Sequence, residues 1–241
     1  MIEAVVVTWN LCAGTNPACP LFRATGPEMA RAVAAVVPRD AGVVFLQESC
    51  TGGDAALRGQ LEAATGRAWV VRSVGLTRPD GSPYRCHPDL LGRDRGTQAV
   101  TVAVADPAAR FATYRLSSPP WSAVRYALCA TAPVRACTSH LSSGLSWDDH
   151  QPGAPYRNKQ VRELMAAAGP RAVVGGDLNL RPHSLAAVYQ GRQECDPRRR
   201  ATHEGGNKLD YLFAPKGTVR GCRVVRGAPS DHRPLVLRTA P

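Results

Sequence analysis

The chain alternates between short apolar runs and stretches with apolar residues three or four positions apart. Apolar runs bounded by Gly, Pro, Asn or Asp predict strands. These fall at 5–9, 42–47, 68–74, 97–105, 110–116, 126–132, 134–141, 171–175, 208–213, 219–226 and 234–239. Helical spacing predicts helices at 29–37, 54–64, 157–168 and 184–188. The polar segments 77–96 and 142–155 remain as long loops, which in compact domains are often functional.

Strands and helices interleave through both halves of the chain, without a linker, an internal repeat or a low-complexity tract. The length of 241 residues and the hydrophobic content of 44% suit one large α/β domain or two small ones. The absence of a linker favours one domain that spans residues 1–241. We expect two β-sheets packed face to face, with helices outside.

Six short polar signatures follow or interrupt the apolar runs. VVV precedes Asn10, VVFL precedes Glu48 and AVVGG precedes Asp177. The six are Thr8-Trp9-Asn10, Leu46-Gln47-Glu48, Ser139-His140-Leu141, Gly176-Asp177-Leu178-Asn179, Leu209-Asp210-Tyr211 and Ser230-Asp231-His232. Because strands deliver polar residues to a sheet edge, residues far apart in sequence can converge there.

The chemistry of these signatures indicates a metal-assisted hydrolytic site. They contain carboxylates, carboxamides and two histidines, without a serine or cysteine nucleophile arrangement. This inventory suits a hard divalent cation, a bound water and an acid/base pair. Each residue also has a structural alternative. Asn10, Asp177 and Asn179 suit turns after strands, and Asp210 with His232 suits a buried structural pair.

The charge balance favours a polyanionic partner. The chain has 30 Lys and Arg against 19 Asp and Glu, a formal net charge of +11. Nucleic acid and an anionic membrane surface both fit this excess. Biased composition with fully solvated charge is the alternative. No run of about 18 apolar residues predicts a transmembrane segment.

Eight cysteines without a Cys-x-x-Cys motif favour disulfides and an oxidising compartment. A three-residue loop at 132–134, centred on Pro133, would place Cys129 opposite Cys137 across a hairpin. Sequence proximity suggests Cys12–Cys19, Cys50–Cys86 and Cys195–Cys222, and eight reduced thiols are the alternative. No signal peptide is visible, since the chain enters the strand-like run 2–9 at once. For a secreted or otherwise extracytoplasmic protein, we therefore expect a leader that was removed.

In their order along the chain, the six signatures resemble the endonuclease/exonuclease/phosphatase superfamily. They look nearest to its nuclease branch, with deoxyribonuclease I and the cytolethal distending toxin B subunit. This resemblance covers residues 8–234. It implies a four-layer α/β sandwich with two mostly antiparallel sheets, and a phosphodiester hydrolase that depends on Mg²⁺, with Mn²⁺ or Ca²⁺ as other candidates.

The resemblance also implies a role for each signature residue. Asn10 and Glu48 resemble the metal end, and Asp231 a further carboxylate in the metal and acid/base region. Asp177 and Asn179 resemble the pair that positions the attacking water and the phosphoryl oxygens. His232, held by Asp210, resembles the histidine near the scissile phosphate. His140 resembles the second active-site histidine.

One segment departs from the deoxyribonuclease I pattern. There a glutamate supports the histidine that corresponds to His140, whereas this chain has Arg95-Gly96-Thr97-Gln98 in that region. Either Gln98 orients a neutral group or His140 works differently. Arg95 and Asn158 are substrate-contact candidates by the same resemblance.

We expect a monomeric, secreted endonuclease that acts on DNA, because the charge and the disulfide pattern favour one. A phosphoinositide or small-molecule phosphatase of the same superfamily is the alternative. A non-catalytic nucleic-acid-binding protein is the alternative of another class.

Overall fold

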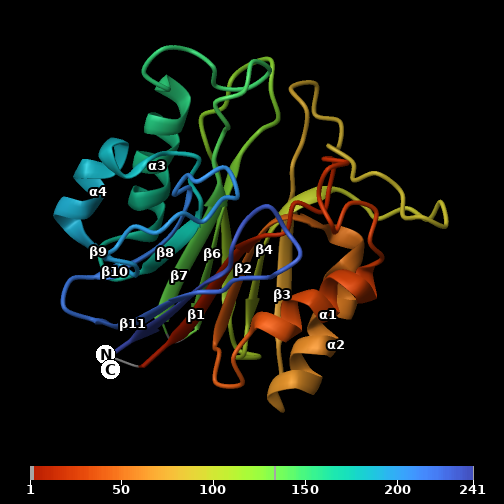
Figure 1. Cartoon of the computed structure of the whole chain (residues 1–241), viewed down its shortest axis with the longest axis horizontal. Coiled ribbons are helices and arrows are strands. Elements are labelled where there is room, and N and C mark those ends of the chain that lie inside the picture. Colours follow the sequence, from red (N-terminus) through yellow and green to blue (C-terminus); the bar gives the residue numbers. More distant parts are fainter. Residues whose placement is uncertain (1–2, 133, 241) are drawn as a thin grey trace.

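The computed structural model describes residues 3–132 and 134–240 and contains two six-stranded sheets (Figure 1). The first sheet has the order β11-β12-β1-β2-β4-β3 and the second β5-β6-β7-β8-β10-β9. The strands of the first are β1 Val5–Asn10, β2 Val43–Cys50, β3 Val70–Gly75, β4 Gln98–Val104, β11 Val219–Val224 and β12 Leu235–Thr239. Those of the second are β5 Arg110–Arg115, β6 Tyr126–Ala132, β7 Val134–His140, β8 Val173–Asp177, β9 Arg192–Glu194 and β10 Asp210–Pro215.

The helices cover the outer faces of the two sheets. They are α1 Gly26–Val36, α2 Asp54–Thr65, α3 Pro155–Ala168 and α4 Ala186–Gly191, with short 3-10 turns at Thr51–Gly53 and Pro182–Leu185. Figure 1 shows α1 and α2 on one flank and α3 and α4 on the other. Between the sheets, a buried apolar layer includes Val6, Phe45, Leu128 and Leu212. The four-layer α/β sandwich predicted from the sequence is thereby confirmed.

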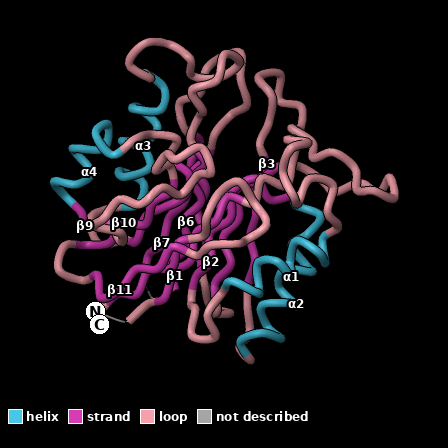
Figure 2. The backbone as a smooth tube through the Cα atoms, viewed as in Figure 1, coloured by secondary structure: helices cyan, strands magenta, loops and turns pink. Residues whose placement is uncertain are grey.

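Each sheet is antiparallel except for one central parallel pair, β1 with β2 and β7 with β8. The parallel strands β1 and β2 begin with the apolar runs VVV and VVFL, as expected for strands covered on both faces. Figure 2 shows the longest loops gathered at the end of the sheets opposite the chain termini. The strands β1, β7 and β8 end there in Asn10, His140 and Asp177.

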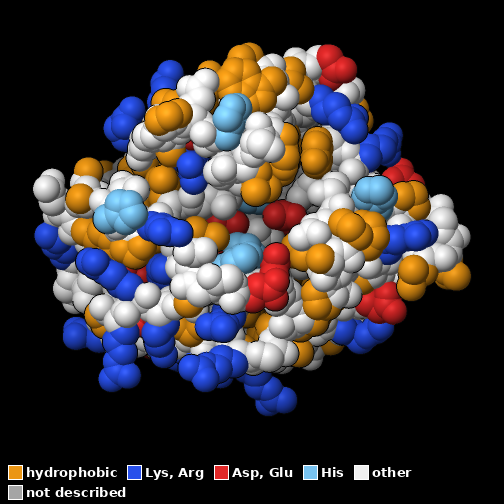
Figure 3. Space-filling model, turned by 45° about the horizontal axis from the view of Figure 1, so that its top comes forward, with side chains coloured by type: hydrophobic (Ala, Val, Ile, Leu, Met, Phe, Trp, Pro, Cys, Tyr) orange, Lys and Arg blue, Asp and Glu red, His pale blue; other side chains and the backbone are white. Residues whose placement is uncertain are grey.

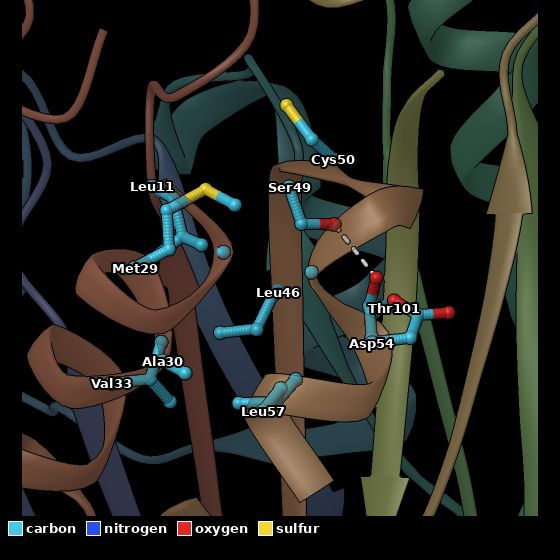
Figure 4. Close-up of a pocket in the computed structure, with 12 residues that line it drawn as sticks. Leu11, Met29, Ala30, Val33, Leu46, Ser49, Cys50, Asp54, Leu57 and Thr101 are labelled. Atoms are coloured by element: carbon cyan, nitrogen blue, oxygen red, sulfur yellow. Dashed lines mark hydrogen bonds between the residues drawn. The ribbon is translucent and has the colours of Figure 1, made fainter. Parts of the chain in front are cut away.

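The interface between the first helical layer and its sheet is apolar (Figure 4). Met29 and Val33 of α1 and Leu57 of α2 line a small cavity with Leu11 and Leu46 of the sheet side. At its polar side, the hydroxyls of Ser49 and Thr101 lie 2.7 Å apart. This packing fixes β2, which carries Glu48, against the rest of the sandwich.

The first helix starts earlier than its apolar spacing predicts. The helix begins at Gly26 because Thr25 and Glu28 form a capping box, in which each side chain bonds the backbone N–H of the other. The short strand β9 was not predicted. It reads Arg-Gln-Glu, so it has no apolar alternation, and only its pairing with β10 reveals it.

Strand β2 contains an extra residue opposite β4. Leu46 pairs with Thr101 but Ser49 pairs with Ala99, so three steps on β2 match two on β4. Glu48 within this bulge has a φ of 52°, in the left-handed region that non-glycine residues seldom adopt. Bulges of this kind re-aim side chains next to active sites.

All four disulfides expected from the sequence are present: Cys12–Cys19, Cys50–Cys86, Cys129–Cys137 and Cys195–Cys222. Cys129 and Cys137 are direct cross-strand partners in the β6–β7 hairpin. Pro133, where we placed the turn, lies outside the described residues. Within the described ranges, each helix is too short or too polar to cross a membrane.

Candidate active site

Three chemically active side chains lie in one row at the edge of the second sheet. His140 pairs in register with Asp177, and Asp177 pairs with Asp210 on its other side. Close strand approach requires the glycine before Asp177. A Cβ on Gly176, whose φ is 123°, would lie 2.1 Å from the carbonyl oxygen of Ser139. The Gly-Asp sequence therefore packs β8 closely against β7 and fixes Asp177 at the centre of the row.

Asn10 connects this row to the first sheet. Its Nδ2 donates to Asp177 Oδ2 at 3.0 Å and to Glu48 Oε1 at 3.2 Å. Its Oδ1 accepts a hydrogen bond from the backbone N–H of Cys12 at 2.9 Å. In this arrangement the Asn10 amide presents N–H groups to the two carboxylates, and its oxygen is bonded to the backbone of Cys12. The expectation that Asn10 binds a metal stays a prediction.

His232 and Asp210 form a close buried pair. His232 Nδ1 lies 2.7 Å from Asp210 Oδ2, and His232 Nε2 lies 3.8 Å from Asp177 Oδ2. Burial alone lowers the pKa of His232, but the Asp210 and Asp177 carboxylates outweigh it and raise that pKa to about 10. The raised pKa favours the protonated form of His232, whose Nε2 lies toward Asp177 at the pocket.

The pKa of Asp177 is raised above that of an ordinary carboxylate. Burial raises its pKa to about 7, although the positive charge of His232 opposes this rise. The backbone N–H of Asn179 and the amide of Asn10 hold its two oxygens in place. A fixed carboxylate with a pKa near 7 is suited to proton exchange at neutral pH.

His140 differs from His232 in charge. Burial, followed by the positive charges of Arg125 and His232, holds the pKa of His140 well below its usual value. Its Nε2 lies 3.5 Å from Asp177 Oδ2 and 3.9 Å from Glu48 Oε1. Its Nδ1 is buried and has no hydrogen-bond partner among the described residues. No hydrogen bond joins Gln98 to His140 within the described residues, so Gln98 is not seen to orient the ring.

Glu48 and Asp231 are the carboxylates best placed to hold a divalent cation. Burial raises the pKa of Glu48, and Asn10 donates the one hydrogen bond that its side chain accepts from the described residues. Burial opposes ionisation of Asp231, but contact with His203 and the charge of His232 keep its pKa below the usual range. Neither carboxylate pairs with Lys or Arg in the described part of the chain, so the pair fits a cation that prefers oxygen ligands.

Two groups bring His and Asp metal-ligand atoms within 4.8 Å of one another: His203, Asp231 and His232, and Asp177, Asp210 and His232. Both contain His232, whose pKa is raised and whose Nδ1 is engaged by Asp210. A protonated imidazole has no lone pair for a metal. Proton binding at His232 therefore competes with metal binding in both groups.

The carboxylates and histidines line one pocket of about 570 Å³ at the end of both sheets. Figure 3 shows acidic and histidine side chains at the bottom of a hollow on this face. Asn179 also lines it, with Nδ2 bonded to the carbonyl of Leu141 and a φ of 49°. The structure thus brings together seven of the predicted site residues, His140, Asp177, Asn179, Asp231, His232, Glu48 and Asn10, with Asp210 directly behind His232.

The two predicted substrate contacts do not reach this pocket. The Arg95 guanidinium is buried, where it donates to the carbonyl oxygens of Ala13 at 2.9 Å and His87 at 3.4 Å. Asn158 Nδ2 donates to the carbonyl of Gly153 at 2.6 Å. Both side chains satisfy backbone carbonyls of loops. Arg95 and Asn158 are therefore positioned as structural residues, and we do not carry them forward as substrate contacts.

Sequence reasoning missed two residues of the pocket. Arg125 lines it and forms a buried ion pair with Asp148 at 2.6 Å. His203 lies with Nε2 3.7 Å from Asp231 Oδ2 and with its ring against that of His232. The signal for Arg125 was a charged residue directly before an apolar strand. His203 had no such signal, because its pairing with His232 depends on the tertiary fold.

Comparisons with known proteins identify the family and the fold. The sequence profile of the Endonuclease/Exonuclease/phosphatase family matches residues 7–232. Among curated proteins, none matches the chain significantly.

Solved structures of similar fold cover nearly the whole chain. An endonuclease/exonuclease/phosphatase from Beutenbergia cavernae is 21% identical with a TM-score of 0.69, over 98% of this chain and 71% of that one. One from Bacteroides vulgatus is 15% identical with a TM-score of 0.63, over 100% and 99%. The human nocturnin catalytic domain, with bound sulfate, is 17% identical with a TM-score of 0.65, over 99% and 93%. With its profile match over most of its length, the chain belongs to the Endonuclease/Exonuclease/phosphatase family.

Proposed function

We propose that this protein is an extracytoplasmic, Mg²⁺-dependent endonuclease that hydrolyses DNA. The family is hydrolytic, its members include nucleases and phosphatases, and they generally depend on a divalent metal. The observation that carries the proposal is the position of Asp177. Its carboxylate lies within 4 Å of Asn10, His140 and His232, which come from both sheets.

The residues divide the chemistry of phosphodiester hydrolysis between them. Asp177, with its pKa near 7, accepts a proton from the attacking water, which Asn179 helps to position. His232, protonated and held by Asp210, donates a hydrogen bond to a phosphoryl oxygen as negative charge develops there. As the water oxygen bonds to phosphorus, the P–O bond to the sugar oxygen breaks, and this leaving oxygen takes a proton from solvent water in the open pocket. Neutral His140 places its Nε2 beside Asp177 and donates a further hydrogen bond.

A metal ion bound by Glu48 and Asp231 would supply positive charge to the phosphoryl oxygens. Mg²⁺ suits this site because it takes one or two carboxylates and keeps several waters. Asn10 maintains the spacing between Glu48 and Asp177, so that one carboxylate serves the cation and the other the proton transfer.

A polyanionic substrate is supported by unpaired positive charge on the surface. Arg200 pairs with Asp196, whereas exposed Arg198 and Arg220, which line a groove beside β9 and β11, form no ion pair within the described residues. Figure 3 shows Lys and Arg side chains grouped below and to the left of the hollow. Positive charge of this kind supplies most of non-specific binding to nucleic acid.

Secretion is supported by the four disulfides, which leave every cysteine of the chain paired. Disulfides persist in oxidising compartments and are rare in cytosolic proteins. For that reason we place the activity outside the cytoplasm.

A substrate panel tests the proposed function. Plasmid DNA, RNA and a phosphoinositide are incubated with Mg²⁺, Mn²⁺, Ca²⁺ or EDTA, with the wild type and the Asp177→Ala variant in parallel. We expect Mg²⁺-dependent nicking of plasmid DNA that EDTA and the substitution abolish. Release of phosphate from the phosphoinositide with intact plasmid would move the protein to the phosphatases. Salt-dependent DNA binding without any hydrolysis would make it a binding protein.

A further inference from the structure

One polar side chain of the pocket has no part in the chemistry above. Gln98, the first residue of β4, is only 4% exposed, and its amide lines the same pocket as Glu48 and His140. Within the described residues, this amide makes no hydrogen bond to the protein. The amide therefore faces the open pocket, where it can bind a group that presents a donor beside an acceptor.

The surrounding backbone restricts the position of the Gln98 side-chain amide. Gly14 lies directly against it, since a Cβ at Gly14 would approach Gln98 Cδ to 2.8 Å. The carbonyl of Gly14 is itself fixed by the N–H of His87 at 3.0 Å. The Gln98 backbone bonds Tyr84 on one side and Leu76 on the other, at 2.9 and 2.8 Å. The amide is therefore confined and not a mobile surface group.

Gln98 continues the row of site residues along the edge of the first sheet. The strand order β12-β1-β2-β4 places His232, Asn10, Glu48 and Gln98 one after another. Gln98 pairs with Cys50, two residues beyond Glu48. A group bound at Gln98 consequently lies on the Glu48 side of this row, at the opposite end from His232.

Aromatic and apolar side chains line the same pocket as Gln98. Tyr84 and Leu76 are backbone hydrogen-bond partners of Gln98, and Trp147 and Leu145 come from the loop after β7. Trp147 is 52% exposed and Leu145 54%. Aromatic walls stack on flat rings, and an amide pairs with a ring edge that presents a donor beside an acceptor.

We infer that Gln98, Tyr84 and Trp147 form a subsite for the nucleobase on the Glu48 side of the cleaved phosphate. This inference rests on the proposed function. An acyl chain in the same place would leave the Gln98 amide unsatisfied in an apolar contact, which is costly. A base satisfies the amide and stacks on the rings, so the lining selects a base over a lipid tail.

The test compares two dinucleotides. One is complete, and the other is identical but lacks the base on one side of the phosphate. With Mg²⁺, the wild type should lose about tenfold or more in kcat/KM when the base on one side is removed. Gln98→Ala and Trp147→Ala should lose a similar factor on the complete dinucleotide and almost nothing on the abasic one. Gln151→Ala, an exposed glutamine outside the pocket, is the matched control.

A binding measurement complements the kinetics and guards against misfolding. In EDTA, a 5′-mononucleotide should quench tryptophan fluorescence of the wild type, and Trp147→Ala should remove that quenching while circular dichroism stays unchanged. Equal losses of Gln98→Ala on both dinucleotides would assign Gln98 to the phosphate and overturn the subsite. Equal rates of the wild type on both dinucleotides would overturn the subsite and leave the nuclease intact. If the wild type cleaves no dinucleotide but hydrolyses a phosphoinositide, both the subsite and the proposed nuclease function are overturned.

Discussion

Asn10 Nδ2 lies 3.0 Å from Asp177 Oδ2 and joins β1 of the first sheet to β8 of the second at the bottom of the pocket. The two residues are separated by 167 positions in the sequence. The same amide nitrogen holds Glu48 at 3.2 Å. A single carboxamide thus keeps two buried carboxylates at a fixed spacing; in the proposed mechanism, Glu48 serves the cation and Asp177 the proton transfer.

The first prediction concerns this bridge. Asn10→Ala removes the shared donor, so Glu48 and Asp177 repel each other and lose their orientation. We expect kcat to fall about 100-fold, the loss typical of one positioned donor. Steady-state kinetics on plasmid DNA measures it, and Asn10→Asp, which adds a third negative charge, should be at least as slow. An unchanged kcat in Asn10→Ala would show that the bridge is dispensable.

The second prediction concerns pH and stability in EDTA. The pKa of Asp177 is raised from 3.8 to about 7, so the folded state keeps a proton that the unfolded state releases. Its contribution to the free energy of unfolding is therefore fully present below about pH 4 and lost as the pH rises through about 7. Denaturant unfolding at pH 4.5 and 7.5 measures this loss. Asp177→Asn should show a smaller decline than the wild type, and an equal decline in both would contradict the assignment.

The third prediction concerns the cation. Glu48→Gln keeps the shape of the side chain and its bond with Asn10 but removes the charge that attracts the metal. We expect the Mg²⁺ concentration for half-maximal activity to rise by about 10- to 100-fold. In the wild type, Mg²⁺ should also raise the melting temperature, because binding to the folded state stabilises it. Glu204→Gln, an exposed glutamate, is the control and should behave like the wild type.

The fourth prediction separates structure from substrate binding at Arg95. Its guanidinium satisfies the carbonyls of Ala13 and His87 in the interior. Arg95→Met should lower the free energy of unfolding by about 1–3 kcal/mol, because it leaves buried acceptors unpaired. The KM for DNA should stay within about twofold, as the substitution removes no charge from the pocket. A large increase in KM with unchanged stability would restore Arg95 as a substrate contact.

Much of the fold could be predicted because its physical causes are local. Apolar runs such as Val43–Leu46 indicate buried strands, and the hairpin spacing places Cys129 opposite Cys137. The ends of these runs also marked Asn10, His140 and Asp177. Their convergence was expected from strand ends meeting at a sheet edge, and the superfamily resemblance gave the number and layering of the sheets.

Other features depend on contacts that the sequence does not show. The bulge that re-aims Glu48 arises from the register of β2 against β4. Arg95 reads as an exposed loop arginine, and only the folded loops reveal the carbonyls that it satisfies. His203 is placed by its backbone pairing with His232, across 29 positions that carry no local pattern.

The central claim is that Asp177 and His232 act on the same phosphodiester, and a double-mutant cycle tests it most directly. The measurement is the rate of nicking of supercoiled plasmid DNA under saturating Mg²⁺ by the wild type, Asp177→Ala, His232→Ala and the double variant. We predict that each single variant loses about 1,000-fold or more, and that the double variant is nearly as fast as the slower single one, because groups that act as a unit are not additive. Losses that multiply in the double variant, or a single variant that nicks DNA at the wild-type rate, would contradict the account.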